Sequence, residues 1–230
     1  MRPQSTVWKN PSRRAALKAL ALVASTLPTS ALAALKTLLP AGKQQQDFIT
    51  HNPLPLALET SRQAFGQGPI TAIAQFFVRN NLPMPETAIV ADRDRWSIQI
   101  KGCQTSWELT LADLKTFETT TVASVLQCSG NGRAFFSHSP SGSPWGVGAA
   151  GCALWTGVKV SEVLSHFEGA EPRARFLTAT GAESLPAGID VASVGVERSV
   201  PLEKGVRDAL LVWEMNGEPL PLVHGGPVRL

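Results

Sequence analysis

A β-branched stretch that runs straight into a cysteine and a glycine turn is the strongest constraint on this chain. Residues 119–127 have the sequence TTTVASVLQ and predict a buried strand that delivers Cys128. The segment Ser129–Gly132 predicts a tight turn, because it contains two glycines and an asparagine. Arg133 follows directly. A thiol and a guanidinium around such a turn predict a ligand that approaches the backbone closely. The alternative is an ordinary buried cysteine ahead of a surface turn.

A second apolar stretch also ends in polar side chains. We expect a strand over residues 73–81, which contains Arg79, Asn80 and Asn81 at its end and is stopped by Pro83. Open α/β folds place ligand-binding groups at the ends of buried strands, which makes Arg79 a candidate binding residue. The alternative is that its side chain simply leaves the core for solvent.

Composition limits the chain to one main domain and excludes several classes of protein. With 230 residues and 43% hydrophobic content, the chain can bury a substantial core. Its three cysteines are too few for a disulfide framework and lack the spacing of a zinc site. Residues 34–230 hold 16 Lys and Arg against 18 Asp and Glu, a formal charge of −2. No basic surface for nucleic acid is therefore expected.

The first 33 residues predict an export signal. Five basic residues precede an apolar run at 19–23 and a small-residue site at Ala31–Ala33. The pair Arg13–Arg14 is similar to a twin-arginine signal, with Ala16 where a bulky residue is usual. The apolar run is too short to span a bilayer stably, so we expect no membrane span after signal removal; the alternative is an anchor. Twin-arginine export carries folded proteins, which predicts a bacterial periplasmic protein that receives a cofactor before export.

The remaining patterns predict an α+β domain over residues 34–230. Strands are expected over residues 96–100, 107–109 and 175–179. A capping-box-like start at Thr110 predicts a short helix through Phe117. A second helix is expected with Ser161 as its N-cap and Gly169 as its stop. The pair Asn216–Gly217 predicts a tight turn.

Five segments together resemble the sulfite oxidase family of molybdopterin enzymes. They are FFVRNN at 76–81, LTLADLK at 109–115, LQCSGNGR at 126–133, WGVGAAGCALWTGV at 145–158, and the stretch from RSVPLEK to HGGPVRL at 198–230. The CSGN form of the cysteine motif and the export signal are most similar to the bacterial sulfite dehydrogenase branch. The resemblance implies a molybdopterin-binding domain of mixed β-sheets with short helices and many loops.

The resemblance also implies a molybdenum–molybdopterin cofactor (Moco) with Cys128 as the protein ligand of the metal. Molybdenum bound by soft dithiolene sulfurs favours a thiolate ligand. Arg79 and Arg133 are then expected to hold a small oxyanion such as sulfite through charge-assisted, forked hydrogen bonds. Trp145 matches a tryptophan that lines the family's substrate pocket, and the alternative for it is a core aromatic residue.

Further residues are expected to bind the pterin. They are Phe77, Asn80, Asn81, Ser184, His224 and Arg229. Of these, His224 and Arg229 match family residues that bind the cofactor, and Ser184 falls on a pterin-contacting loop. Asn81 departs from the family, which commonly has histidine there; an amide can still donate and accept hydrogen bonds but carries no charge.

The implied reaction is oxygen-atom transfer that oxidises sulfite to sulfate and passes electrons to a c-type cytochrome. No CxxCH motif occurs in this sequence, so the haem is expected on a partner or in further sequence. Three alternatives stay open. The substrate can be another oxyanion or a sulfoxide, or the chain can be non-catalytic and bind only cofactor or a partner. A thiol hydrolase using Cys128 is the third, although no motif places a histidine to activate the thiol.

The family's sequence continues beyond the segment that matches HGGPVRL. It includes an active-site tyrosine, a further substrate arginine and an immunoglobulin-like domain often used for dimerisation. This sequence contains no tyrosine. We therefore expect a molybdopterin-binding domain that is incomplete at its C-terminus and lacks the immunoglobulin-like domain, and the oligomeric state stays open.

Overall fold

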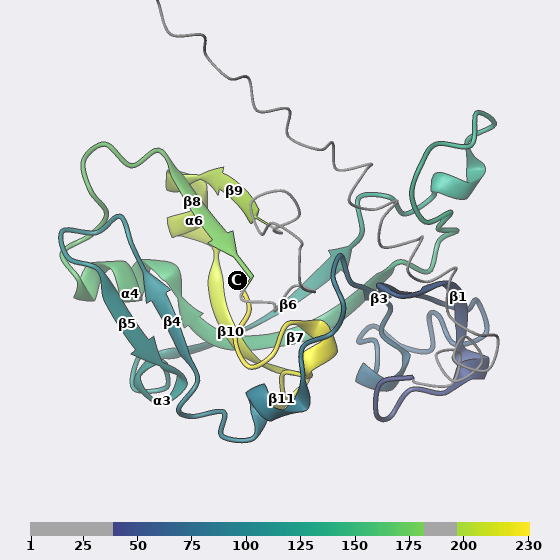
Figure 1. Cartoon of the computed structure of the whole chain (residues 1–230), viewed down its shortest axis with the longest axis horizontal. Coiled ribbons are helices and arrows are strands. Elements are labelled where there is room, and N and C mark those ends of the chain that lie inside the picture. Colours follow the sequence, from purple (N-terminus) through teal and green to yellow (C-terminus); the bar gives the residue numbers. More distant parts are fainter. Residues whose placement is uncertain (1–38, 182–196) are drawn as a thin grey trace, which may run out of the picture.

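The chain folds into several small antiparallel sheets joined by loops and short helices (Figure 1). The computed structural model describes residues 39–181 and 197–230. Its sheets have three, four, two and two strands. This arrangement confirms the predicted α+β class with short helices and many loops. Within the described residues, no helix is long and apolar enough to cross a lipid bilayer.

The central sheet has the strand order β11-β10-β7-β6 and carries the cysteine turn. Its strands are β6 (Thr119–Gln127), β7 (Ala150–Lys159), β10 (Leu210–Met215) and β11 (Glu218–Pro219). Strands β6 and β7 pair along their length, from Thr119 opposite Val158 to Gln127 opposite Ala150. On the other side of β7, a Cβ at Gly157 would collide with the backbone of Leu211. Glycine at this position therefore lets β10 approach β7 closely.

Strand β6 lies where the sequence predicts it, but the predicted burial is wrong. Among the described strands it pairs with β7 alone, so it forms an edge of the sheet. Most of its residues are exposed, and Val125 is 62% exposed. Strand β7 is the buried neighbour. A β-branched run predicts a strand but not its position in the sheet, because the burial of a strand depends on its neighbours in the sheet rather than on the run itself.

Two smaller strand pairs and several short helices complete this part of the fold. These elements are η3 (Thr87–Val90), β4 (Ser97–Ile100), β5 (Trp107–Thr110), α3 (Leu111–Leu114), η4 (Arg133–Phe135), α4 (Val160–His166), β8 (Phe176–Thr180), β9 (Glu197–Pro201) and α6 (Leu202–Asp208). The three strands predicted in this part are confirmed. The predicted capping box is present: the Thr110 hydroxyl accepts the Asp113 amide at 3.1 Å, and the Asp113 carboxylate accepts the Thr110 amide at 2.8 Å. The helix itself ends at Leu114, before the predicted Phe117.

Two other predicted boundaries are wrong. Helix α4 has Lys159 as its N-cap residue, so Ser161 lies inside the first turn. The strand expected over residues 73–81 is a 3-10 turn, η2 (Ile73–Gln75), followed by the two-residue strand β3 (Val78–Arg79). The apolar residues between them are buried all the same. An apolar run signals burial, and here the burial is that of an extended segment rather than of a long strand.

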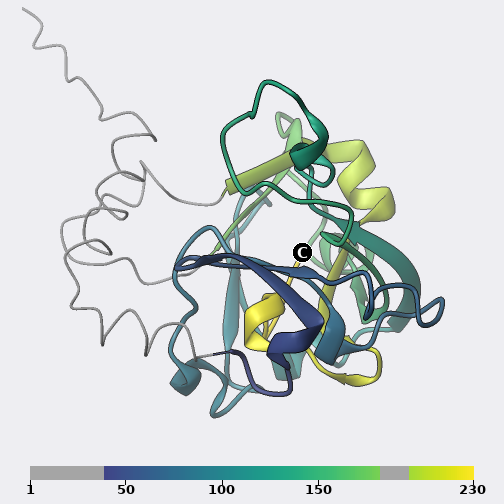
Figure 2. The ribbon, with the colours of Figure 1, turned by 90° about the vertical axis from the view of Figure 1, so that its right-hand side faces the viewer.

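A three-stranded N-terminal sheet packs against the C-terminal segment (Figure 2). It follows the 3-10 turn η1 (Gln45–Asp47) and consists of β1 (Phe48–Pro53), β2 (Leu56–Thr60) and β3 in that order. Phe48, Leu58 and Val78 form a small core with Val223 of η5 (Leu222–His224). This core fixes η5 against the N-terminal sheet.

The C-terminal segment joins the N-terminal sheet to the central sheet. Asn216 and Gly217 have φ angles of +55° and +79°, which confirms the predicted tight turn between β10 and β11. After η5, the Arg229 amide donates to the Val212 carbonyl at 2.9 Å and the Val212 amide donates to the Arg229 carbonyl at 2.7 Å. Residues 222–229 therefore lie between the two sheets.

Candidate functional site

The Cys128 turn is held in place by backbone hydrogen bonds. The Cys128 amide donates to the Ala149 carbonyl at 2.9 Å, and the Asn131 amide donates to the Cys128 carbonyl at 2.9 Å. Gly132 has a φ of +86°, a conformation that favours glycine and confirms the predicted turn. The half-buried thiol sulfur accepts the Gly130 amide at 3.5 Å. The turn thus presents a fixed sulfur at the end of β6.

Arg133 folds back over the same turn. Its guanidinium donates to the Ser143 carbonyl at 2.8 Å and is half-buried. A Cβ at Gly130 would lie 2.5 Å from the guanidinium, and a Cβ at Gly142 would lie 2.6 Å from it. Glycine is therefore needed at both positions for Arg133 to occupy this place. The result is a cation on the cysteine turn that keeps donors free for an anion.

Trp145 lies beneath this turn as a fully buried residue. Its side chain is 1% exposed, and its carbonyl accepts the Ala134 amide at 2.9 Å. Its ring makes edge contacts with His51 at 4.9 Å and with Phe77 at 6.5 Å between centroids. This environment is that of a core aromatic residue that supports the turn. We refer to Cys128, Arg133 and Trp145 as the turn cluster.

The segment 77–81 is divided between core and surface. Phe77 is buried in the same apolar cluster against which Cys128 packs. Asn80 is half-buried, and its amide donates to the Leu56 carbonyl at 2.9 Å. The Arg79 side chain is exposed and donates to the side chain of Asn81. In the described contacts, no bond brings Arg79 to the turn cluster, and its expected role toward an oxyanion stays a prediction.

His224 and Arg229 form a second group, the C-terminal cluster. His224 is 5% exposed, and its Nε2 atom has no hydrogen-bond partner among the described residues. Burial, together with the positive charges of Lys43 and Arg229, lowers the pKa of His224 to about 3. Arg229 donates to the His224 carbonyl at 2.9 Å, and its guanidinium lies 5.8 Å from the Trp155 ring centroid. The cluster thus holds a neutral imidazole beside a half-buried cation.

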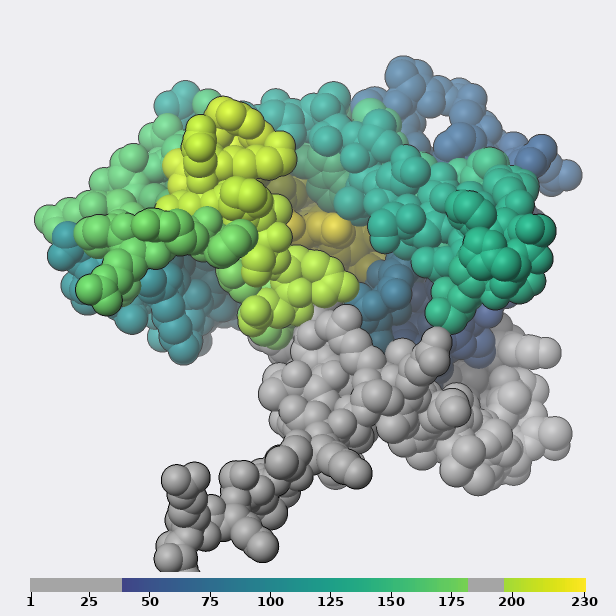
Figure 3. All heavy atoms as spheres, turned by 90° about the horizontal axis from the view of Figure 1, so that it is seen from above, coloured from purple at the N-terminus to yellow at the C-terminus, as the bar shows by residue number. Residues whose placement is uncertain are grey.

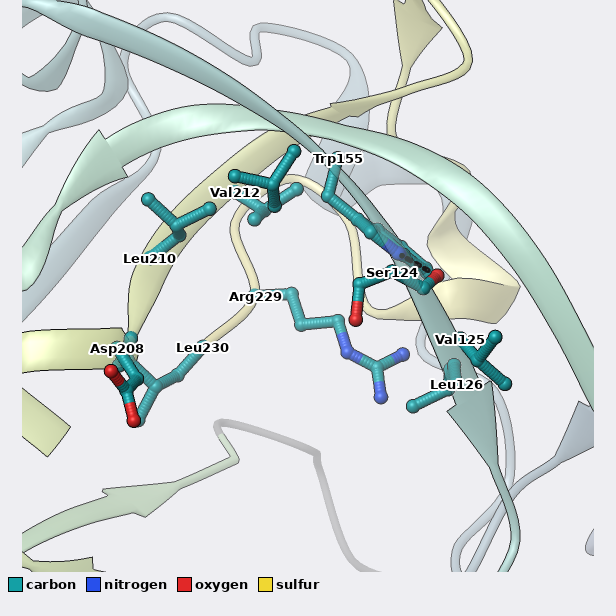
Figure 4. Close-up of a pocket in the computed structure, with 11 residues that line it drawn as sticks. Ser124, Val125, Leu126, Trp155, Asp208, Leu210, Val212, Arg229 and Leu230 are labelled. Atoms are coloured by element: carbon teal, nitrogen blue, oxygen red, sulfur yellow. Dashed lines mark hydrogen bonds between the residues drawn. The ribbon is translucent and has the colours of Figure 1, made fainter. Parts of the chain in front are cut away.

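A cavity of about 240 Å³ opens between β6 and the C-terminal residues. The space-filling view shows the molecule hollowed at this place, with C-terminal residues at the bottom of the hollow (Figure 3). The lining residues are Val122, Ser124, Val125, Leu126, Trp155, Asp208, Ala209, Leu210, Val212, Arg229 and Leu230. Figure 4 shows the Arg229 guanidinium pointing into the space beside Leu126. An anionic group entering this mostly apolar cavity would meet that guanidinium.

Two aromatic residues connect the turn cluster with the C-terminal cluster. Phe76 and Phe77 stack with their ring centroids 5.4 Å apart. Phe77 contacts Trp145, and Phe76 contacts His224 with a centroid distance of 5.4 Å. The structure therefore joins two of the predicted groups through one apolar cluster. The predicted pterin contact Ser184 and the predicted signal at 1–33 lie outside the described residues.

Sequence patterns missed three polar residues near these clusters whose side chains are buried or nearly so. They are Lys43, His51 and Glu59, all from the N-terminal part. Lys43 donates to the carbonyls of Ile73 and Phe76 at 2.8 and 2.7 Å. Glu59 follows the apolar run Leu54–Leu58 directly, as Arg79 follows its own run. A charged residue at the end of a buried run was the one available signal.

The described residues suit a metal ion whose ligands come mostly from a cofactor rather than from the protein. No group of three or more His, Cys, Asp or Glu side chains within them converges to hold a metal ion. Cys128 offers one soft sulfur ligand on a turn kept open by Gly130. The unpartnered Nε2 of His224 and the guanidinium of Arg229 are polar groups that the edge of a pterin would satisfy. This donor set fits molybdopterin.

Comparison with known proteins supports the same cofactor. Residues 82–230 match the model of the oxidoreductase molybdopterin binding domain. Mitochondrial sulfite oxidase from Macaca fascicularis is 34% identical over 183 residues, covering 76% of this chain and 32% of that protein. The NADPH nitrate reductase of Neurospora crassa is 28% identical over 224 residues, covering 85% of this chain and 22% of that protein. The chain thus spans about a third of the sulfite oxidase and less of the nitrate reductase.

A solved structure has a related fold. The sulfane dehydrogenase SoxCD from Paracoccus pantotrophus superimposes with a TM-score of 0.62 and 27% identity, covering 79% of this chain and 43% of that chain. The domain model covers well over half of the present sequence, and both the cysteine turn and the C-terminal cluster lie inside the matched range. The chain therefore belongs to the sulfite oxidase family of molybdopterin-binding oxidoreductases, whose cofactor is molybdenum held by molybdopterin.

Proposed function

We propose that this chain forms the cofactor-binding part of an enzyme that oxidises sulfite to sulfate. The observation that carries this proposal is the turn cluster, in which a fixed thiol and a guanidinium share one glycine turn. The similarity to sulfite oxidase of the macaque and to the SoxCD sulfane dehydrogenase supports chemistry on a small sulfur compound. Because the chain spans only part of those proteins, the substrate is proposed here and not carried over from them.

The two clusters would bind different parts of the cofactor. Cys128 would ligate the metal through its sulfur, and His224 and Arg229 would hold polar groups of the pterin. When bound, the molybdenum centre supplies oxygen-atom transfer and takes up two electrons. The chain contributes the position of the ligands and the apolar wall formed by Phe76, Phe77 and their neighbours.

Arg133 is the proposed anion-binding residue. Its guanidinium is fixed through the Ser143 carbonyl and through its packing on Gly130 and Gly142. A fixed, planar cation loses little conformational entropy on binding an oxyanion and can donate two parallel hydrogen bonds. Arg79 would join it if the bond to Asn81 exchanges for one to the substrate.

We further propose export to the periplasm and a c-type cytochrome as electron acceptor. The support for export is the basic pair Arg13–Arg14 ahead of an apolar run and a small-residue cleavage site. Replacing both arginines with lysine is expected to leave the protein in the cytoplasm, as measured by cell fractionation. Periplasmic protein in that double variant would exclude the twin-arginine route.

Metal analysis and a sulfite assay test the proposed reaction. The full chain is purified from a host that makes molybdopterin, beside Cys128→Ser and the control Cys152→Ser, which changes another half-buried cysteine. We expect about one molybdenum per chain and sulfite-dependent reduction of ferricyanide or cytochrome c for the wild type and the control. Cys128→Ser is expected to lose the sulfite activity. Metal-loaded wild type without sulfite oxidation would refute the substrate, and an active Cys128→Ser variant would refute the metal ligand.

Reduction of nitrate is a second candidate function. Nitrate reductase of Neurospora crassa matches 85% of this chain, a larger share than the 76% matched by the macaque sulfite oxidase. Nitrate, like sulfite, is a small oxyanion that Arg133 is suited to bind. Nitrate-dependent oxidation of reduced methyl viologen by the metal-loaded protein, without sulfite oxidation, would favour this candidate.

A further inference from the structure

Glu59 is a buried carboxylate with three hydrogen-bond donors around it. It lies near the end of β2, and the residue is 4% exposed. One carboxylate oxygen, Oε2, accepts the Gly146 amide at 2.8 Å and lies 2.6 Å from His51 Nε2. The other oxygen, Oε1, accepts the Gly148 amide at 2.9 Å. Burial raises the pKa of Glu59, but the hydrogen bonds from His51, Gly146 and Gly148 outweigh burial and hold the pKa below its usual range.

The two amides that Glu59 binds belong to a segment that carries the cysteine turn. We call residues 145–149 the supporting segment. Its carbonyls accept the Cys128, Gly132 and Ala134 amides at 2.9, 2.6 and 2.9 Å. In return, the Ala149 amide donates to the Asn131 side chain at 3.0 Å. Four hydrogen bonds therefore connect the supporting segment to residues 128–134.

Close packing fixes the supporting segment against β2. A Cβ at Gly146 would lie 2.7 Å from the Glu59 carboxylate, and a Cβ at Gly148 would collide with the Thr60 carbonyl oxygen. The Thr60 amide also donates to the Gly148 carbonyl at 3.2 Å. The two glycines let the backbone approach the carboxylate directly, so a shift of Glu59 passes to the supporting segment without a flexible side chain between them.

We propose that Glu59 is a positioning residue that sets the place of the Cys128 sulfur and the Arg133 guanidinium through the supporting segment. It contacts neither cofactor nor substrate in this scheme. Residue 59 lies in the N-terminal sheet, outside the range 82–230 that matches the domain model. The catalytic consequence rests on the proposed function, whereas the position of the Cys128 sulfur does not.

A carboxylate suits this position better than an amide. Three donors converge on its two oxygens, and an ionised carboxylate offers acceptors alone. In a Glu59→Gln variant, the side-chain NH₂ must face either the Gly146 amide or the Gly148 amide. One buried N–H then loses its acceptor, which is costly inside a protein. The supporting segment is expected to loosen at that glycine.

Thiol labelling of the metal-free full chain tests the proposal. The chain has three free cysteines in the described residues: Cys103 is buried, whereas Cys128 and Cys152 are half-buried. In Glu59→Gln, we expect the labelling rate of Cys128 relative to Cys152 to change by about tenfold, with Cys103 still protected. Hydrogen exchange of the Gly132 and Ala134 amides should accelerate by a similar factor, while the β4–β5 hairpin is unchanged.

Two further variants keep the test decisive. Glu108→Gln is the matched control, because Glu108 is an exposed glutamate on β5 whose carboxylate accepts the Ser97 hydroxyl. It should leave both readouts unchanged. Glu59→Asp keeps the charge but shortens the side chain by one methylene, and it should give the same local signature at a smaller size. It decides the question if rapid Cys103 labelling shows that Glu59→Gln has unfolded.

Lower thermal stability without a change in the Cys128 to Cys152 ratio, in a folded variant, would overturn the proposal, because Glu59 would then only stabilise the N-terminal sheet. The outcome is also separable from that of the proposed function. The labelling and exchange measurements need no metal and no substrate, so a chain that fails to oxidise sulfite can still show the Glu59 effect.

Discussion

Replacing Lys43 with methionine tests whether one buried ammonium group makes the stability of this chain depend on pH. Lys43 is 9% exposed, donates to the carbonyls of Ile73 and Phe76, and lies 5.1 Å from the ring centroid of Phe48. Among the described residues, no carboxylate forms an ion pair with it. Burial lowers the pKa of Lys43 from its ordinary value of 10.5 to about 7.

The direction of the effect follows from proton binding. Between pH 7 and pH 10.5, the unfolded chain keeps the proton on Lys43, whereas the folded chain has released it. The free energy of unfolding therefore rises with pH in this window, because the unfolded state binds more protons. With a slope close to 1.4 kcal/mol per pH unit above the folded pKa, the gain between pH 7 and pH 9 is about 2 kcal/mol.

Urea unfolding of the wild type and Lys43→Met at pH 7, 8 and 9, under reducing conditions, measures this contribution. The difference between the two proteins should grow in favour of the wild type by about 2 kcal/mol across this range. Lys115→Met is the control, because Lys115 is 44% exposed and pairs with Asp94 at 2.6 Å. Its difference from the wild type should stay constant. Parallel pH profiles for the wild type and Lys43→Met would refute the assigned burial of the charge.

Three further predictions concern other parts of the chain. Burial lowers the pKa of His224 to about 3, so the unfolded chain binds more protons than the folded chain below pH 6.5. The free energy of unfolding should therefore fall by about 2 kcal/mol between pH 6.5 and 4.5. In urea unfolding, the free energy of His224→Gln should depend less on pH over this range. Thr110→Ala removes the capping box and should lower the free energy of unfolding by about 1 kcal/mol at neutral pH. An unchanged free energy would show that the cap does not stabilise α3. Gly130→Ala places a methyl group 2.5 Å from the Arg133 guanidinium and should raise the KM for sulfite while molybdenum content is kept; an unchanged KM would argue against Arg133 as the anion-binding residue.

Local patterns predicted the elements whose conformation depends on neighbouring residues. The β4 and β5 strands, the Thr110 capping box and the Asn216–Gly217 turn were all found where the sequence indicates them. Each depends on hydrogen bonds or φ angles within a few residues. The Cys128 turn belongs to the same class, because Gly132 must adopt a positive φ whatever surrounds it.

Position within the fold was harder to predict than local conformation. The exposure of β6 depends on the strand order, which a single β-branched run does not contain. The middle of residues 73–81 is apolar because Phe76 and Phe77 fill the core between the two clusters, and that role needs no strand. The family resemblance, in turn, predicts which residues bind a cofactor, a prediction that stays open, and it does not predict that Arg79 bonds to Asn81.

The hydrogen-bond partners of the buried charges in the N-terminal part could not be predicted from any local pattern, for a further physical reason. Glu59 is separated from Gly146 by 87 residues along the chain, and Lys43 is separated from Phe76 by 33. Glu59 binds backbone amides as well as His51, and Lys43 binds only backbone carbonyls. A backbone partner is present whatever side chain occupies its position, so the contacts of Glu59 and Lys43 with backbone groups leave no complementary charge for a sequence pattern to reveal. The N-terminal sheet therefore supports the site through hydrogen bonds to backbone groups, and these bonds can be identified only in the folded structure.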